Sequence, residues 1–275
     1  FCYFDSYQDA PDSQPEAIGG YLPLSKVYSF NPVPDTLSAD KVQLVYGVQA
    51  NLFTEYIPTP EHAEMMIYPR ILALAEVAWS APSVKNYDDF HVRALKEVEA
   101  LKAEGYHPFE LKNEIGNRPG ADQPVQHLAV GKKVAYGPDA AYYPGYSAGG
   151  DSALVDGVIG GWTYGDRRWQ GFIDKKRMDV TIDMEKETEI HSVGADFMQV
   201  CGPEVFMPSE VIISVSNDGK EFTELKRMEH KVVKDDKVTF INFGWEGNAK
   251  ARYIRYQASS GEFGGFLFTD EIVVK

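Results

Sequence analysis

The chain has 275 residues, a hydrophobic content of 44% and a formal net charge of −14 at pH 7. The length suits one large or two ordinary domains, and the apolar and aromatic content argues against disorder. The acidic balance argues against nucleic acid and anionic membrane surfaces as partners, and no apolar run approaches the roughly 20 residues of a membrane span. Cys2 and Cys201 are far apart with no metal-ligand spacing around either, so we expect free thiols rather than a disulfide.

Residues 1–115 carry the pattern of strands followed by helices. The expected strands are residues 1–7 and 42–53, and the expected helices are residues 24–28, 61–79 and 86–105. The second strand ends in polar and aromatic side chains, and Pro58, Thr59 and Pro60 then break the backbone. This order predicts two βα units plus an additional helix.

A candidate site lies at the end of the strand over residues 42–53. Functional groups of α/β proteins gather at the C-terminal ends of strands. Phe53 and Glu55 are two residues apart, so on a strand they point the same way. A carboxylate beside an aromatic ring suits a sugar, because the ring covers an apolar face and the carboxylate accepts from hydroxyls. The pattern is equally consistent with Phe53 in the core and Glu55 capping the next helix.

The pattern of residue types in the sequence changes after residue 115. Asn117, Pro119, Gly120 and Pro124 predict a linker over residues 116–124. Short alternating segments follow at residues 125–130, 178–184, 189–197, 210–216, 237–243, 251–258 and 266–274. Asn217, Asp218 and Gly219 form a hairpin-turn signal. Because no convincing helical pattern occurs here, residues 125–275 predict an all-β sandwich.

Three sequence motifs in residues 1–115 occur in an order and spacing typical of one enzyme family. They are YFD at residues 3–5, GVQANLFTE at 47–55 and PRILALAEVAWS at 69–80. Residues 1–115 resemble the end of the catalytic domain of glycoside hydrolase family 20, the β-N-acetylhexosaminidases. The resemblance implies the last two βα units of a (β/α)8 barrel, with the motifs on its seventh and eighth strands and its last helix.

The same resemblance implies roles for individual residues. Tyr3 matches the catalytic tyrosine that hydrogen-bonds the 2-acetamido carbonyl of the substrate. Asp5 and Glu55 match substrate-binding carboxylates that contact sugar hydroxyls. Phe53 stands where the family usually has a tryptophan floor, which keeps an apolar platform but loses area and the indole donor. The expected partners are therefore glycans with terminal β-linked N-acetylhexosamine, cleaved by substrate-assisted retaining catalysis.

The family's adjacent Asp–Glu pair, which orients the acetamido group and protonates the leaving oxygen, is absent. Asp270–Glu271 is the only such dipeptide, and it lies in the expected sandwich. A complete barrel needs about 250 residues, far more than precede the sandwich. We therefore expect a C-terminal portion of an exo-β-N-acetylhexosaminidase that is inactive alone and needs no cofactor for catalysis. The location usual for members of the family implies a secreted, periplasmic or cell-surface protein. The alternatives are a carbohydrate-binding or structural accessory module, and a barrel remnant without function.

Residues 125–275 contain sequence motifs of another family. They are ALVDGVIGGW at 153–162, VTIDM at 180–184, PSEVIISVSNDGKEF at 208–222, ARYIRYQA at 251–258 and TDEIVV at 269–274. Residues 125–275 resemble the discoidin, or coagulation factor 5/8 type C, domain, a galactose-binding-like fold that includes carbohydrate-binding module family 32. The resemblance implies a β-sandwich and leaves the ligand open.

Two candidate sites follow in this part. Many members hold a structural Ca²⁺, and Asp156 and Glu271 stand at the positions of its ligands. The alternative is that Asp156 makes its turn and Glu271 is a surface residue. Arg167, Arg168 and Trp169 form the cluster that most resembles a glycan-binding site. The alternative is that aromatic residues such as Trp169 belong to the core. The histidines show no ligand spacing, and none of them is assigned chemistry.

Overall fold

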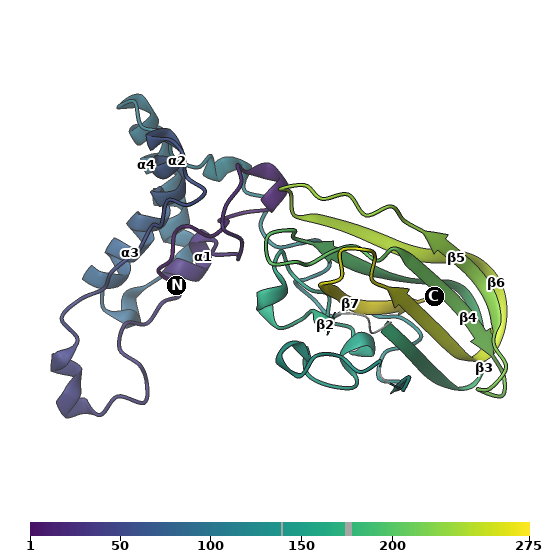
Figure 1. The fold of residues 1–275 in the computed structure, drawn as a ribbon. Coiled ribbons are helices and arrows are strands. Elements are labelled where there is room, and N and C mark those ends of the chain that lie inside the picture. The colour runs from purple at the N-terminus through teal and green to yellow at the C-terminus, as the bar shows by residue number, and fades with distance from the viewer. Residues whose placement is uncertain (139, 174–177) are drawn as a thin grey trace. The chain divides into compact units, whose positions relative to one another are not determined.

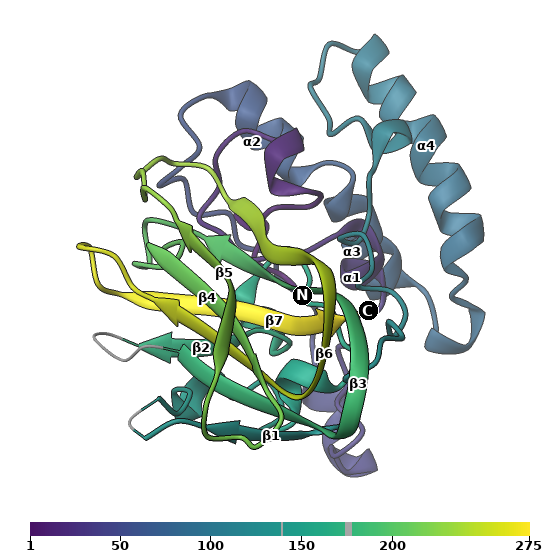
Figure 2. The same ribbon diagram turned by 90° about the vertical axis from the view of Figure 1, so that its right-hand side faces the viewer.

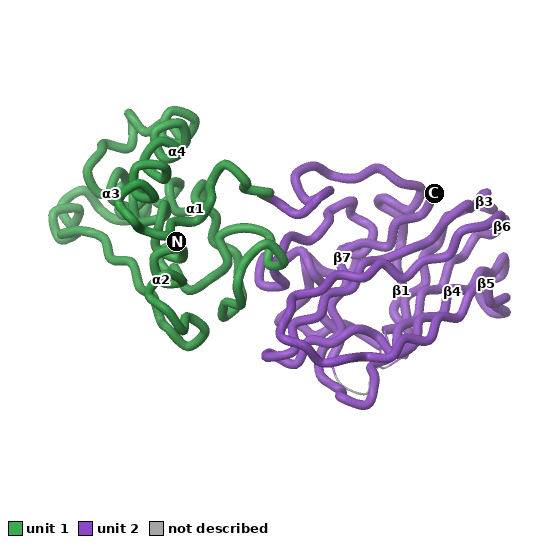
Figure 3. Tube along the Cα trace, turned by 90° about the horizontal axis from the view of Figure 1, so that it is seen from above, with its two compact units in different colours: residues 1–116 green, residues 117–275 purple. Residues whose placement is uncertain are grey.

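The computed structural model describes residues 1–138, 140–173 and 178–275, and the chain divides into two compact units, Phe1–Gly116 and Asn117–Lys275 (Figure 3). Residues 117–124, expected to be a linker, belong to the second unit. The Arg118 side chain is buried there, donates to the Gly160 carbonyl over 2.7 Å and pairs with Asp270 over 2.7 Å. This anchoring makes the stretch part of the sandwich.

The first unit is mainly helical (Figure 1). Its helices are α1 Leu24–Tyr28, α2 Pro60–Ile67, α3 Arg70–Trp79 and α4 Tyr87–Ala103, with 3-10 turns at Pro11–Ser13, Ala39–Leu44, Pro82–Val84 and Leu111–Asn113. Thr59 caps α2 and Asn86 caps α4, each through a side-chain oxygen that accepts a backbone N–H of the first turn. The expected single helix over residues 61–79 is wrong, because Pro69 has no N–H to continue the helix and α2 ends before it.

The strands expected in the first unit are reduced to isolated parallel bridges. Tyr3 bridges to Asn51, and Tyr7 bridges to Tyr21. Val42 and Leu44, expected in an apolar strand, lie in a 3-10 turn and are exposed. Parallel strands are stable when neighbours cover both faces, and the described residues give each segment a single bridged partner. The core of this unit is instead built by α1, α3 and α4, where Tyr28 stacks on Phe90.

The second unit is an antiparallel β-sandwich without α-helices in its described residues (Figure 2). Its strands are β1 Lys133–Tyr136, β2 Gln170–Ile173, β3 Met178–Gln199, β4 Glu210–Ser216, β5 Thr223–Glu229, β6 Thr239–Ser259 and β7 Phe266–Val274. They pair in the order β2-β7-β3-β6-β4-β5, with β1 also on β3. Buried residues alternate along β3 and meet those of β4, β6 and β7 in one core.

Most of the expected strands are confirmed, some with different ends. The strands over residues 210–216 and 266–274 are β4 and β7, and the Asn217–Asp218–Gly219 turn joins β4 to β5. Residues 178–184 and 189–197 form one continuous strand, as do residues 237–243 and 251–258 apart from the first two positions. The prediction of a strand over residues 125–130 is wrong. The backbone of that segment makes no ladder, with one N–H bond to the Gly157 carbonyl and one to the Val274 carbonyl, and β1 follows it.

Candidate functional site

The bridge in the first unit brings Tyr3 and Phe53 together. Phe4 N–H donates to the Asn51 carbonyl over 2.8 Å, and Asn51 N–H donates to the Cys2 carbonyl over 2.7 Å. The two rings are stacked with centroids 6.0 Å apart and an interplanar angle of 22°. Tyr3 is 56% exposed and Phe53 is 55% exposed. The result is an open aromatic surface that carries a phenolic hydroxyl.

Asp5 lies two residues after Tyr3, and its charge acts on the buried Arg70. Arg70 is fully buried and donates to the carbonyls of Phe4, Ser6, Leu22 and Met66. Burial lowers the pKa of Arg70 to about 9, and the charge of Asp5 opposes that shift. Asp5 is buried, and its Oδ1 has no hydrogen-bond partner among the described residues. Such an oxygen is costly unless satisfied, and a ligand hydroxyl would satisfy it.

Glu55 stands apart from the other three residues. It is exposed in the turn after Phe53, and no hydrogen bond or ion pair in the described part of the chain joins it to Tyr3, Asp5 or Phe53. The alternative placing of these residues is wrong, since Phe53 is exposed and Thr59 rather than Glu55 caps α2. The structure therefore brings Tyr3 and Phe53 together, buries Asp5 on the Tyr3 segment and leaves Glu55 exposed to solvent.

The Asp270–Glu271 dipeptide is part of the sandwich interior. Asp270 accepts from Arg118 and from Gly160 N–H, and burial raises the pKa of its carboxyl to about 6. Glu271 Oε1 accepts from His127 Nε2 over 2.7 Å and from Gly157 N–H over 2.9 Å. Both carboxyl groups thus hold loops against β7 and have no surface at which to meet a substrate.

The Asp156–Glu271 pair has features that suit a cation. Glu271 Oε2 is buried without a hydrogen-bond partner among the described residues, and Asp156 lies close enough to shift the pKa of Glu271 upward. Burial is the largest cause of the raised pKa of both carboxyl groups. The described residues hold no cluster of three or more His, Cys, Asp or Glu side chains for a metal. Two carboxylates supply hard oxygen donors, the kind that Ca²⁺ takes.

The proposed glycan cluster of Arg167, Arg168 and Trp169 is dispersed by the fold. Trp169 is fully buried, donates to the Gly161 carbonyl and packs on Phe268, so it cannot stack on a ligand. Arg168 binds Asp166 and the Ala121 carbonyl, which uses its guanidinium to hold the loop. Arg167 is exposed. The prediction of a shared aromatic and cationic surface is wrong, because β2 begins at the next residue and turns Trp169 inward.

Three residues that organise these sites were not predicted to do so from the sequence. Arg70, Arg118 and His127 are buried and bind across long sequence separations, from 42 to 152 residues for Arg118. Buried charged residues are exceptional, and only their partners in space identify them. Cys2 and Cys201 are both free thiols, as expected. No described helix is long and apolar enough to cross a membrane.

The second unit is a discoidin-like β-sandwich, and the helical first unit is consistent with the end of a (β/α)8 barrel. Residues 1–82 match the glycosyl hydrolase family 20 catalytic domain, and residues 139–272 match the F5/8 type C domain. The chain therefore consists of a segment of a family 20 catalytic domain followed by an F5/8 type C domain.

Relatives of the first segment are hexosaminidases. A β-hexosaminidase of Porphyromonas gingivalis is 49% identical over 88 residues, which are 32% of this chain and 11% of the relative. A β-N-acetylhexosaminidase of Cellulomonas fimi is 32% identical over 96 residues, 35% of this chain and 19% of the relative. The chain thus spans a small part of the length of both relatives.

Solved structures similar to the chain include a family 32 carbohydrate-binding module of Clostridium perfringens in complex with GalNAc-β-1,3-galactose. It is 18% identical and covers 54% of this chain and 99% of its own, with a TM-score of 0.38.

Proposed function

We propose that this chain is the C-terminal part of an exo-β-N-acetylhexosaminidase that hydrolyses terminal N-acetylglucosamine or N-acetylgalactosamine. The observation that carries the proposal is the Tyr3–Phe53 stack. It joins two of the family 20 sequence motifs in space and presents a platform and a phenol to solvent. A secreted, periplasmic or cell-surface location belongs to the same proposal and rests on the location usual for members of the family.

Each residue of the group has a role in this reaction. The Tyr3 hydroxyl donates to the acetamido carbonyl and holds its oxygen near the anomeric carbon, where it attacks and forms an oxazoline. Phe53 covers an apolar face of the sugar ring. Asp5 and Glu55 accept hydrogen bonds from ring hydroxyls. The free position of Glu55 requires that it move toward the ring when substrate binds.

We also propose that residues 1–275 alone do not hydrolyse the substrate. The general acid is missing, and the one Asp–Glu dipeptide is buried in the sandwich. The test is the turnover of 4-nitrophenyl N-acetyl-β-glucosaminide by a sample whose intact mass is measured. We expect no turnover from this chain and turnover from a longer chain that extends upstream. Turnover by the 275-residue chain itself would overturn the proposal.

Asp156 and Glu271 are proposed to hold a structural Ca²⁺. The unpartnered Oε2 of Glu271 is the observation that supports it. The cation would supply charge neutralisation between the loop at Asp156 and β7, and it takes no part in hydrolysis.

A further inference from the structure

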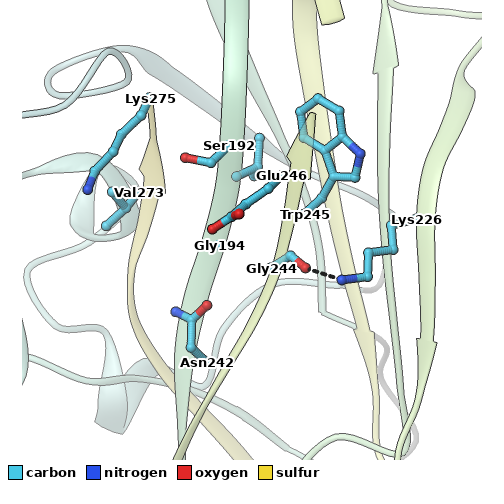
Figure 4. A pocket seen from close by; sticks show the side chains of 10 residues that line it. Ser192, Gly194, Lys226, Asn242, Gly244, Trp245, Glu246, Val273 and Lys275 are labelled. Atoms are coloured by element: carbon cyan, nitrogen blue, oxygen red, sulfur yellow. Dashed lines mark hydrogen bonds between the residues drawn. The ribbon is translucent and has the colours of Figure 1, made fainter. Parts of the chain in front are cut away.

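Two features of the structure lie outside the proposed function, a hollow on the sheet of the second unit and the third family 20 motif. The hollow has a volume of about 530 Å³ and lies on β3 and β6 (Figure 4). The side-chain oxygen of Asn242 fills the space above Gly194 and Gly244, where an added Cβ would lie 2.9 Å and 3.0 Å from it. Lys226 donates to the Gly244 carbonyl over 2.8 Å. Among the described residues, none that line the hollow has a buried polar atom without a partner, so it offers a ligand no unsatisfied buried group.

The third motif, PRILALAEVAWS at residues 69–80, supplies none of the proposed sugar contacts. It forms α3, whose Ala73 and Leu74 are buried in the core of the first unit. Arg70, the first residue of α3, is equally buried, with 0% of its surface exposed. Buried arginines are exceptional and need partners. Packing of the helix therefore explains the apolar residues of the motif but not its arginine.

All five N–H groups of the Arg70 guanidinium donate to backbone carbonyls. Nη1 donates to Ser6 over 2.9 Å and to Leu22 over 3.1 Å. Nη2 donates to Phe4 and, over 2.6 Å, to Met66, and Nε donates to Met66 over 3.1 Å. Because a guanidinium has five N–H donors, none remains for a side-chain carboxylate.

Two of these carbonyls lie on either side of Asp5 in the chain. Because Phe4 and Ser6 both accept from one guanidinium, the backbone that carries Asp5 is held at both ends. Asp5 Oδ1 is buried without a hydrogen-bond partner among the described residues. The positive charge of Arg70 acts on Asp5 and offsets part of the cost of burying its carboxylate. Arg70 thus fixes Asp5 in place and leaves its oxygen available to a ligand.

The Phe4 peptide joins the three motifs at one point. Its N–H donates to the Asn51 carbonyl over 2.8 Å, in the motif that carries Phe53, and its carbonyl accepts from Arg70 in the third motif. The aromatic stack and Asp5 therefore depend on one length of backbone, which Arg70 holds.

We propose that Arg70 is a positioning residue of the sugar-binding group and acts through Asp5. It holds the backbone from Phe4 to Ser6 so that the Asp5 carboxylate meets the sugar hydroxyls, and it does not itself touch the sugar. Lysine cannot replace it, because three N–H donors on a single nitrogen cannot reach the four carbonyls together. This inference rests on the proposed function and explains why the third motif contains an arginine.

The test is the steady-state kinetics of the longer chain that turns over 4-nitrophenyl N-acetyl-β-glucosaminide. Asp5→Ala should raise KM about 10-fold, the scale of one hydrogen bond to a charged group. Arg70→Lys should raise KM by a similar factor with little change in kcat, because a displaced Asp5 loses the same contact in the ground state and in the transition state. In the double variant, KM should stay within about 2-fold of its value in Asp5→Ala, since both changes remove one contact.

A purely structural role of Arg70 predicts a different result. Val98→Ala is the control, because it removes a buried side chain of α4 from the same core. It should lower the folded fraction, and with it the apparent kcat, but leave KM unchanged. KM is read from whatever fraction of a variant folds. Arg70→Lys with the KM of the unchanged chain, or with the same rise in KM in the presence and absence of Asp5, would overturn the positioning role.

NMR of the unchanged 275-residue chain decides the geometry if Arg70→Lys has no measurable turnover. The guanidinium N–H signals of Arg70 should exchange slowly and show NOEs to the Hα atoms of Phe4 and Ser6, and rapid exchange without these NOEs would remove the positioning role. The kinetics also separate two failures. A raised KM in Asp5→Ala but not in Arg70→Lys removes only the role of Arg70. An unchanged KM in Asp5→Ala, or no turnover by the longer chain, removes the proposed sugar contact itself and the role of Arg70 with it.

Discussion

His127 donates from Nε2 to Glu271 Oε1 over 2.7 Å, and neither side chain is exposed to solvent. The direction of this hydrogen bond is fixed because Nδ1 accepts from Ala129 N–H and Val274 N–H. The segment before β1 is thereby tied to β7 through a pair that the 144-residue separation hides in the sequence.

Replacing this histidine should destabilise the second unit. His127→Ala leaves Glu271 buried with Gly157 N–H as its remaining donor, so the free energy of unfolding should fall by about 2–4 kcal/mol. Urea unfolding followed by tryptophan fluorescence measures the change. His191→Ala, at an exposed position on β3, is the control and should change stability by less than about 0.5 kcal/mol. Equal effects of the two variants would contradict this role of His127.

Calcium should stabilise the chain through Asp156 and Glu271. A ligand at 100 times its Kd stabilises a folded protein by about 2.7 kcal/mol, so the Tm in millimolar CaCl₂ should exceed the Tm in EDTA by several degrees. Glu271→Gln keeps an acceptor for His127 and removes the charge. In this variant the two Tm values should coincide. A calcium response that survives in Glu271→Gln would place the ion elsewhere.

The buried Asp270 gives the stability a pH dependence of known sign. Burial raises its pKa from 3.8 to about 6, so the folded chain retains a proton that the unfolded chain has released. The contribution of this group is therefore complete below about pH 4 and is lost as the pH rises to about 6. Asp270→Asn carries a neutral side chain that cannot titrate, so its stability profile between these pH values should lack that decrease. Parallel profiles for the two proteins would show that Asp270 does not titrate in this range.

Arg70 should be irreplaceable by lysine in the first unit. The guanidinium donates to carbonyls of Phe4, Ser6, Leu22 and Met66, which an ammonium group cannot reach together. Arg70→Lys should cost about 2–4 kcal/mol by leaving buried carbonyls unpaired. Hydrogen exchange of the amides of Phe4 and Leu22 reports the change locally. Arg93→Lys, at an exposed ion pair with Glu76, should leave that exchange unaltered.

In a longer chain that turns over an aryl N-acetyl-β-glucosaminide, Glu55→Ala should lower kcat/KM by about 100-fold or more, the scale of losing a hydrogen bond made in the transition state. Glu61→Ala, in the first turn of α2, is the matched control and should keep full activity. Unchanged turnover of Glu55→Ala would remove Glu55 from the sugar-binding group.

The sequence was most informative where local pattern and tertiary packing agree. The helix α4 and the strands β4 and β7 could be predicted nearly to their ends, because their apolar spacing matches the faces that they bury. The strand over residues 42–53 could not, since Val42 and Leu44 in its first half are exposed and lack neighbours to bury them. The Tyr3–Phe53 pair needed a family resemblance, because only the bridge at Asn51 brings the two segments together. Trp169 was misplaced because an aromatic pattern alone does not distinguish a platform from core.

The long ribbon of β3 and β6 also determines how the second unit must assemble. Met178 pairs with Ala258 at one end and Gln199 with Thr239 at the other, so the whole of β4 and β5 lies within the loop that this pairing closes. The chain loses the entropy of closing that loop before the ribbon gains contacts. Folding of this unit should therefore take milliseconds to seconds, and variants that weaken the ribbon should slow folding more than they speed unfolding.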